Sequence, residues 1–222
     1  MTERAMQGDF DSFLAHATRV QATALCPEVR LHLAGDLDEL WRAQENWLGR
    51  RGLPPPYWGM AWPGGQAIAR HLLDHRARIE GRSVLDLGSG SGLAAIAAAM
   101  MGASHVVAND IDPFACEAMA ANARLAGIEL ETSADDLIGT TGRWDIVLAG
   151  DLWYERFLAA RLMPWLRGLA AGGAMVLVGD LGRAYFPRAG LVEIGRYDVD
   201  TGSCERGKLT TTPLFCIPPH PN

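Results

Sequence analysis

The chain has 222 residues, of which 49% are hydrophobic, and a formal net charge of −6 from 26 acidic and 20 basic side chains. This length and hydrophobic content suit one globular domain with a core of its own, and the acidic balance disfavours long-range attraction to nucleic acid. The four cysteines form no C-x-x-C pair, so we expect no metal site. No apolar run reaches the roughly 18 residues that span a membrane, and residues 1–10 are unlike a signal peptide, so we expect a cytoplasmic protein that does not bind a membrane. We also expect a monomer that binds no nucleic acid.

The first part of the chain, 1–53, is predicted to be an N-terminal helical extension of a core over 54–222, the two forming a single domain overall. Its expected elements are a helix over 9–25, a short exposed strand over 29–33 and a helix over 36–48. Three consecutive prolines at 54–56 then end any helix. The extension could act as a lid over a substrate.

The core alternates strands and helices. Strands are predicted over 83–87, 105–109, 129–133, 144–149 and 174–179, and helices over 66–74, 92–101, 113–126 and 154–170. This alternation predicts a parallel sheet with helices on both faces. Two further extended runs, 191–199 and 209–217, leave no room for a helix between them and therefore form a hairpin. We expect an α/β, Rossmann-like sheet of seven strands, mostly parallel, with the last strand antiparallel.

A glycine-rich turn follows the first core strand. The acid Asp86 ends an apolar run, and Gly88, Ser89 and Gly90 begin the turn. The Walker pattern is missing, and G-x-G-x-x-G fails because Leu93 stands where its last glycine should be. An acid at this point would repel a pyrophosphate but attract a cation. The turn therefore predicts a site for S-adenosylmethionine, whose sulfonium and ammonium are positive; the alternative is an ordinary strand-to-helix turn.

More acids follow the next strands. Asp110, at the tip of the second strand, suits a pair of ribose hydroxyls. It could instead cap the following helix, but Asp112 is the better cap because it precedes a proline. Ile111 would lie against the adenine. Asp135 or Asp136 could accept the adenine amino proton, or either could simply be solvated.

The tetrapeptide Asp151-Leu152-Trp153-Tyr154 follows the fourth strand, where a transferred methyl group would point. Enzymes that methylate the amino group of a base often carry D/N-P-P-Y/F here, and this chain lacks both prolines. Asp151 is therefore interpreted as a lone carboxylate at the reaction centre. It could also cap the helix after this strand, and both roles could coexist.

Together, VLDLGSGSG, NDID, DLWY and PYWGMAWPGGQAIARHLL resemble the seven-strand methyltransferases that modify lysines in non-histone proteins. Within them, GDLWYE and GDLGRAYFP are similar to the group that methylates the electron transfer flavoprotein β-subunit, in its bacterial form. The resemblance covers about residues 50–217. It implies a protein substrate, that β-subunit, and S-adenosylhomocysteine as product. It also implies that Trp58 and Trp62 wall the cofactor pocket, although Trp62 could be a core residue, and that Tyr185 lines the substrate entrance unless it is an ordinary loop aromatic.

The expected reaction is protein-lysine N-methylation. A lysine with an ordinary pKa of about 10.4 needs roughly 4–5 kcal/mol to become a neutral amine at pH 7. Asp151 would raise that pKa, so we expect it to capture and aim the lysine rather than act as a strong base. Tyr154 would share this task or merely pack. The alternatives are a methyltransferase of the same fold that acts on a small molecule, RNA or another protein, and a non-catalytic S-adenosylmethionine-binding protein.

Overall fold

A seven-stranded sheet is the centre of the structure, a computed structural model that describes residues 3–187, 189–201 and 209–219. Its strands are β3 (Ser83–Leu87), β4 (His105–Asn109), β5 (Glu131–Ser133), β6 (Ile146–Gly150), β7 (Met175–Gly179), β8 (Val192–Asp200) and β9 (Leu209–Ile217). They follow the order β5-β4-β3-β6-β7-β9-β8. The strands from β3 to β7 pair in parallel, and β9 is antiparallel to both neighbours. The predicted Rossmann-like sheet with a reversed last strand is confirmed.

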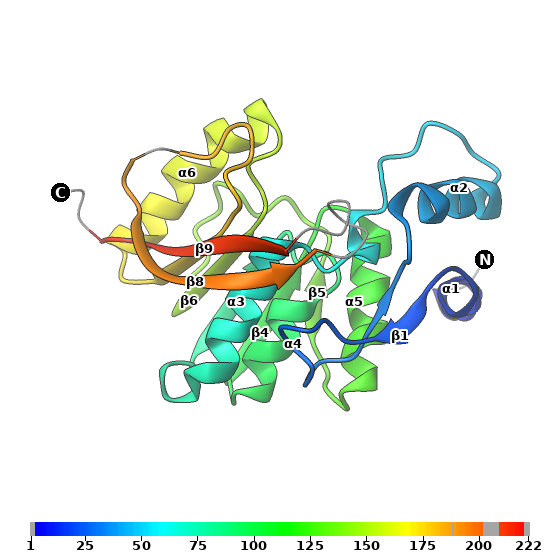
Figure 1. Cartoon of the computed structure of the whole chain (residues 1–222), viewed down its shortest axis with the longest axis horizontal. Helices are drawn as coiled ribbons and strands as arrows, with labels where there is room; N and C mark the ends of the chain where they lie inside the picture. The colour runs from blue at the N-terminus through cyan, green and yellow to red at the C-terminus, as the bar shows by residue number, and fades with distance from the viewer. Residues whose placement is uncertain (1–2, 188, 202–208, 220–222) are drawn as a thin grey trace.

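Helices cover both faces of this sheet (Figure 1). They are α3 (Pro63–Asp74), α4 (Leu93–Met100), α5 (Pro113–Leu125) and α6 (Arg156–Ala171). Alternate residues of β6 show how the faces divide: Ile146 and Leu148 belong to the cluster built with α3, α4 and α5, whereas Val147 and Ala149 belong to the cluster built with α6. Because both faces are buried, β6 and β7 are apolar along their whole length rather than alternating.

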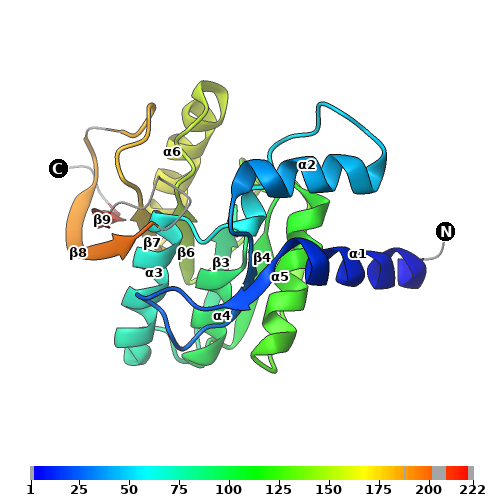
Figure 2. The same ribbon diagram turned by 45° about the vertical axis from the view of Figure 1, so that its right-hand side comes forward.

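The N-terminal extension consists of α1 (Glu3–Ala17), β1 (Arg19–Gln21), β2 (Leu31–Leu33) and α2 (Leu37–Leu48). Figure 2 shows it lying along the α5 side of the molecule. The helix expected over 9–25 starts earlier and ends at Ala17, because the chain turns there into β1, which pairs antiparallel with β2. At α2, Asp36 caps the helix by accepting from the Glu39 N–H, so the expected start is confirmed.

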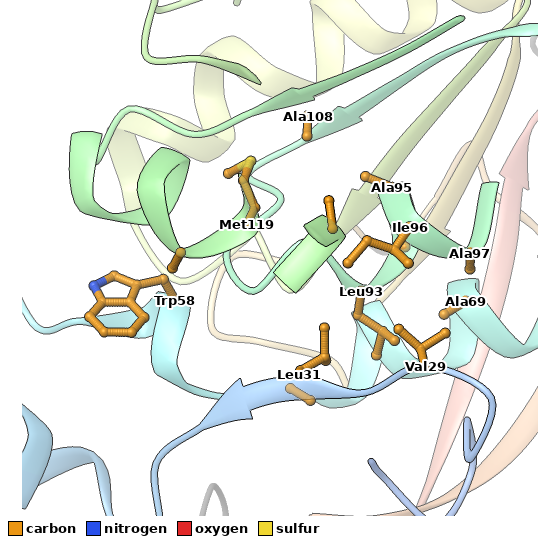
Figure 3. Packing of buried hydrophobic residues seen from close by; sticks show 14 of the residues in the cluster. Val29, Leu31, Trp58, Ala69, Leu93, Ala95, Ile96, Ala97, Ala108 and Met119 are labelled. Atoms are coloured by element: carbon orange, nitrogen blue, oxygen red, sulfur yellow. The ribbon is translucent and has the colours of Figure 1, made fainter. Parts of the chain in front are cut away.

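The expectation that the strand near residue 31 is exposed is wrong. Leu31 is fully buried and Leu33 is buried, and the His32 N–H donates to Asn122 Oδ1 of α5 over 2.7 Å. Figure 3 shows Leu31 and Val29 facing Leu93 and Ile96 of α4. The alternating pattern identified the strand but could not show that α4 and α5 cover its apolar side.

The segment between the extension and the core is short and irregular. It includes a 3₁₀ turn at Tyr57–Gly59, shortly before α3 begins. A second 3₁₀ turn, at Arg76–Arg78, follows α3 within the core. Of the helices in the described residues, none is both long and apolar enough to cross a membrane.

Candidate functional site

A cavity lies between the glycine-rich turn and the start of α3, at the carboxyl ends of the parallel strands. Five of the predicted cofactor residues line it: Trp62, Asp86, Gly88, Ser89 and Gly90. Ligands of open α/β sheets bind at this edge. The remaining wall comes from the segment just before α3, from α3 itself, from the start of α4 and from the end of β6.

The turn depends on glycine for its backbone conformation. Gly88 and Gly90 have φ of 62° and 55°, in the left-handed region that favours glycine. A Cβ on Gly88 would also come within 2.3 Å of the Leu152 side chain. Glycine at position 88 therefore lets Leu152 pack against the turn, whereas a Cβ on Gly90 would meet nothing closer than the Trp58 Cα at 3.9 Å.

Asp86 supports the turn from within the protein. It is buried, and its Oδ2 accepts from Ser89 Oγ over 2.6 Å and from the Ala95 N–H in the first turn of α4 over 3.0 Å. Burial raises the pKa of its carboxyl to about 7. Asp86 thus ties the glycine-rich turn to α4 and places an acid in the cavity wall.

Asp110 reaches the same turn from the end of β4. Its Oδ2 accepts from the Gly90 N–H and its Oδ1 accepts from the Asp112 N–H, both over 3.0 Å. Burial raises the pKa of the Asp110 carboxyl to about 6. Asp112 caps α5 by accepting from the Phe114 N–H over 2.9 Å, so its predicted role as the cap is confirmed.

The other predicted adenine contacts lie outside this cavity. Ile111 is strongly exposed, with 73% of its surface accessible. Asp135 Oδ2 accepts from Ser133 Oγ over 3.2 Å. Asp136 pairs with Arg161 of α6 over 2.8 Å, which leaves its carboxylate directed to a neighbouring helix.

Asp151 joins β6, β7 and α3. Its φ is 56°, its own N–H donates to the Gly179 carbonyl over 2.9 Å, and its Oδ2 accepts from the Gly64 N–H over 2.5 Å. Its Oδ1 pairs with Arg183, 3.0 Å from Nη2 and 3.2 Å from Nε. The expectation that Asp151 could cap the helix after β6 is wrong, because α6 starts behind Glu155 and Asp151 instead binds the first turn of α3.

The electrostatics of Asp151 follow from this burial. With 6% of its side chain exposed, burial raises the pKa of its carboxyl to about 6, while the positive charge of Arg183 opposes the rise and nearby Asp180 adds to it. The positive charge of the paired Arg183 guanidinium favours the carboxylate form of Asp151.

Aromatic rings surround the open side of the site. The Tyr57 ring lies 5.6 Å from both the Trp62 and the Tyr154 ring centroids, and Trp62 Nε1 donates to the Tyr57 carbonyl over 2.8 Å. Burial raises the pKa of the Tyr154 phenol to about 12, so it keeps its proton at neutral pH. Trp58 is buried against Phe10, with ring centroids 5.7 Å apart, and does not line the cavity.

Two features of this site escaped the sequence analysis. The first is Arg183, whose guanidinium carbon lies 5.2 Å from the Trp62 ring centroid in addition to pairing with Asp151. The second is the backbone contact of α3 with the strand ends: a Cβ on Gly64 would lie 2.0 Å from the Gly179 carbonyl oxygen. The structure brings Asp151 and Arg183 together because Gly150 and Gly179 are register partners, so the residues that follow these two strands lie at the same edge of the sheet.

Tyr185 is half exposed, and its N–H donates to the Trp153 carbonyl over 3.0 Å. Within the described ranges, no group of three or more His, Cys, Asp or Glu side chains could hold a metal ion. Cys204, one of the four cysteines, lies outside the described residues.

Comparisons with known proteins give a consistent result. The family model described as ribosomal protein L11 methyltransferase matches residues 67–153. The electron transfer flavoprotein beta subunit lysine methyltransferase of Xenopus laevis is 46% identical over 178 residues, covering 79% of this chain and 71% of its own. The protein of the same name from Danio rerio is 39% identical over 227 residues, covering 96% and 86%.

Solved structures share the fold at low identity. A putative RNA methyltransferase from Pyrococcus horikoshii has a TM-score of 0.54 at 20% identity, covering 75% of this chain and 89% of its own. Magnesium protoporphyrin IX methyltransferase from Synechocystis PCC 6803, with bound SAM, has a TM-score of 0.51 at 17% identity, covering 69% and 78%. At this level of identity the likeness concerns the fold alone.

Proposed function

The chain belongs to the family of electron transfer flavoprotein beta subunit lysine methyltransferases, and from this premise we propose that it methylates a lysine of that β-subunit with S-adenosylmethionine as donor. The observation that carries the proposal is the 39% identity to the zebrafish relative along 96% of this chain. This relationship favours protein-lysine methylation over the small-molecule, RNA and non-catalytic alternatives. It agrees with the cavity beside the glycine-rich turn.

The residues present fit the donor. The positive φ angles of Gly88 and Gly90 shape the turn that lines the cavity, and Asp86 in the cavity wall would place an acid beside a molecule that carries two positive groups. Asp110 would bind the ribose hydroxyls. When bound, S-adenosylmethionine supplies an electrophilic methyl group on its sulfonium.

The adenine end would extend toward the exposed side chain of Ile111. Between the two predicted acids, the contacts favour Asp135 as the partner of the adenine amino group, because Asp136 already pairs with Arg161. Trp62 and Ser89 would complete the wall around the methionine end.

The chain's own residues would position the nucleophile. Asp151 and Tyr154 follow β6, whose last residue, Gly150, lines the cavity, so they stand beside the expected path of the methyl group. Asp151 would hold and aim the lysine through the lone pairs that its present partners leave open, and the phenol oxygen of Tyr154 would accept a hydrogen bond from an amine N–H, so that the nitrogen lone pair stays free to attack the methyl group. Holding the reacting atoms about 3–3.5 Å apart supplies much of the rate acceleration in such a displacement.

The test is direct. The purified full chain is incubated with S-adenosylmethionine and purified electron transfer flavoprotein, and the intact mass of each subunit is measured. We expect the β-subunit alone to gain whole methyl groups, at a lysine identified by peptide mapping. Labelling of a different protein in a cell extract, with an unchanged β-subunit, would overturn the proposed substrate.

A further inference from the structure

Arg183 brings a positive charge to the substrate side of the proposed site. Its guanidinium pairs with Asp151 Oδ1 through Nη2 at 3.0 Å and Nε at 3.2 Å, and its central carbon lies 5.2 Å from the Trp62 ring centroid. Trp62 lines the cavity and Asp151 directly follows a lining residue. The guanidinium therefore lies beside the place that the proposed function gives to the lysine amine.

The loop after β7 is built to present this arginine. Asp180 is fully buried, and its Oδ1 accepts from the N–H groups of Gly182 and Arg183, each over 2.7 Å. Gly182 has a φ of 90°, which allows the tight turn between them. Asp180 thus fixes the backbone of Arg183, while Asp151 and the Trp62 ring fix its guanidinium. The Arg183 side chain is 21% exposed.

The charge of Arg183 would affect the pKa of the substrate lysine. Methyl transfer needs a lysine amine with a free electron pair, whereas a bare carboxylate beside it would stabilise the ammonium form and raise its pKa. A carboxylate already paired with a cation carries no net charge to do so. We propose that Arg183 is a positioning residue that balances the charge of Asp151 and thereby lowers the pKa of the substrate lysine, an inference that rests on the proposed function.

The charged groups around the pair show why a cation matters here. Asp180 faces Asp151 from the loop after β7, while Asp110 and Glu155 act on Tyr154 from the end of β4 and the start of α6. All three are acidic. Without the guanidinium, the reaction centre would have a surplus of negative charge that favours a protonated lysine.

The experiment compares Arg183→Gln, which removes the charge, with Arg183→Lys, which keeps it. Arg196→Gln is the matched control, because Arg196 pairs with exposed Glu193 on β8. For each protein, kcat for β-subunit methylation is measured across neutral and alkaline pH, and S-adenosylhomocysteine binding is measured by calorimetry. The pH dependence of kcat reports the groups that titrate in the enzyme–substrate complex.

We expect Arg183→Gln to move the rising limb of kcat to higher pH by about 1 to 2 units, as removal of a nearby charge does, with cofactor binding retained. Below the limb this equals a loss of about tenfold or more in rate. Arg183→Lys and Arg196→Gln should keep the wild-type limb. The proposal would be overturned if Arg183→Gln lost kcat equally at every pH. It would also be overturned if the rising limb of kcat moved as far in Arg183→Lys as in Arg183→Gln.

A second readout needs no turnover. Carboxyl carbon NMR follows the titration of Asp151, and Arg183→Gln should raise its pKa above that of the wild type. An unchanged titration would overturn the inference even if the β-subunit is methylated. Failure of the wild-type enzyme to methylate the β-subunit at any pH would instead refute the proposed function.

Discussion

Replacing Asp151 with alanine should destabilise the protein as well as stop methyl transfer. The substitution removes the acceptor of the Gly64 N–H and the partner of Arg183, and it places alanine at a φ of 56°. Aspartate tolerates that left-handed conformation better than alanine does. Asp151 therefore contributes to the fold as well as to the proposed chemistry.

The magnitude follows from these contacts. An unsatisfied buried N–H costs about 1–3 kcal/mol. Breaking a fully buried ion pair costs about 3–5 kcal/mol, but the remaining cation here keeps some access to water, so the lower part of that range applies. Since the two costs share one side chain and do not simply add, we expect a loss of about 3 kcal/mol in the free energy of unfolding for Asp151→Ala.

Asp151→Asn is the matched variant. Its amide oxygen can still accept from the Gly64 N–H, and asparagine also tolerates positive φ. We therefore expect about half the destabilisation of the alanine variant, roughly 1–2 kcal/mol, from the lost charge alone. Methyl transfer should be lost in both, while S-adenosylhomocysteine binding should remain close to wild type in Asp151→Asn.

Urea unfolding of the protein without cofactor measures both values, and a thermal melt should place the alanine variant about 6–12 °C below wild type for a chain of this size. If both variants unfold within about 0.5 kcal/mol of wild type, as ordinary surface substitutions do, the contacts of Asp151 do not support the fold and the reasoning fails. If cofactor binding disappears in Asp151→Asn, the residue shapes the cofactor pocket instead.

Three other measurements address the rest of the site. Asp110→Ala should weaken S-adenosylhomocysteine binding by about tenfold to a hundredfold in calorimetry, the equivalent of lost hydrogen bonds to a charged group; unchanged affinity would exclude ribose binding there. Gly179→Ala should lower the free energy of unfolding by about 3 kcal/mol, because its Cβ would meet a backbone oxygen at the start of α3 at 2.3 Å, whereas Gly168→Ala in open space should not destabilise. Because the pKa of Asp86 is raised from 3.8 to about 7, the native state holds a proton that the unfolded chain releases, so stability should fall as pH rises from about 4 to 7. Denaturation at several pH values should show a smaller fall in Asp86→Asn, and an equal fall would contradict the assignment.

The sequence predicted the parts of the site that depend on local order. Gly88 and Asp110 belong to successive strand-turn units, so a correct assignment of β3 and β4 places them side by side at the sheet edge. Asp112 was recognised as the cap because the proline after it fixes the helix start. These predictions needed only the periodicity and the rule that parallel strands end at one edge.

Contacts between distant segments could not be predicted in the same way. Asp151 binds Gly64, 87 positions earlier, and Arg183, 32 positions later, and neither pairing leaves a periodic trace in the sequence. The burial of Leu31 depends likewise on how the extension folds back onto α4 and α5. The alternative that Asp151 caps the helix after β6 failed for this reason, because its partners lie on α3 and on the loop after β7.

The close packing of Gly64 and Gly179 has a consequence for turnover. A Cβ at either glycine would overlap the backbone of the other segment, so the first turn of α3 and the end of β7 have no space in which to slide past each other. Their neighbours Gly65 and Gly150 line the cavity, so this packing holds the part of the cavity wall that α3 and β6 share in a fixed position. Tyr57 and Tyr154 are half exposed to solvent, and we expect a ligand to enter and leave on their side.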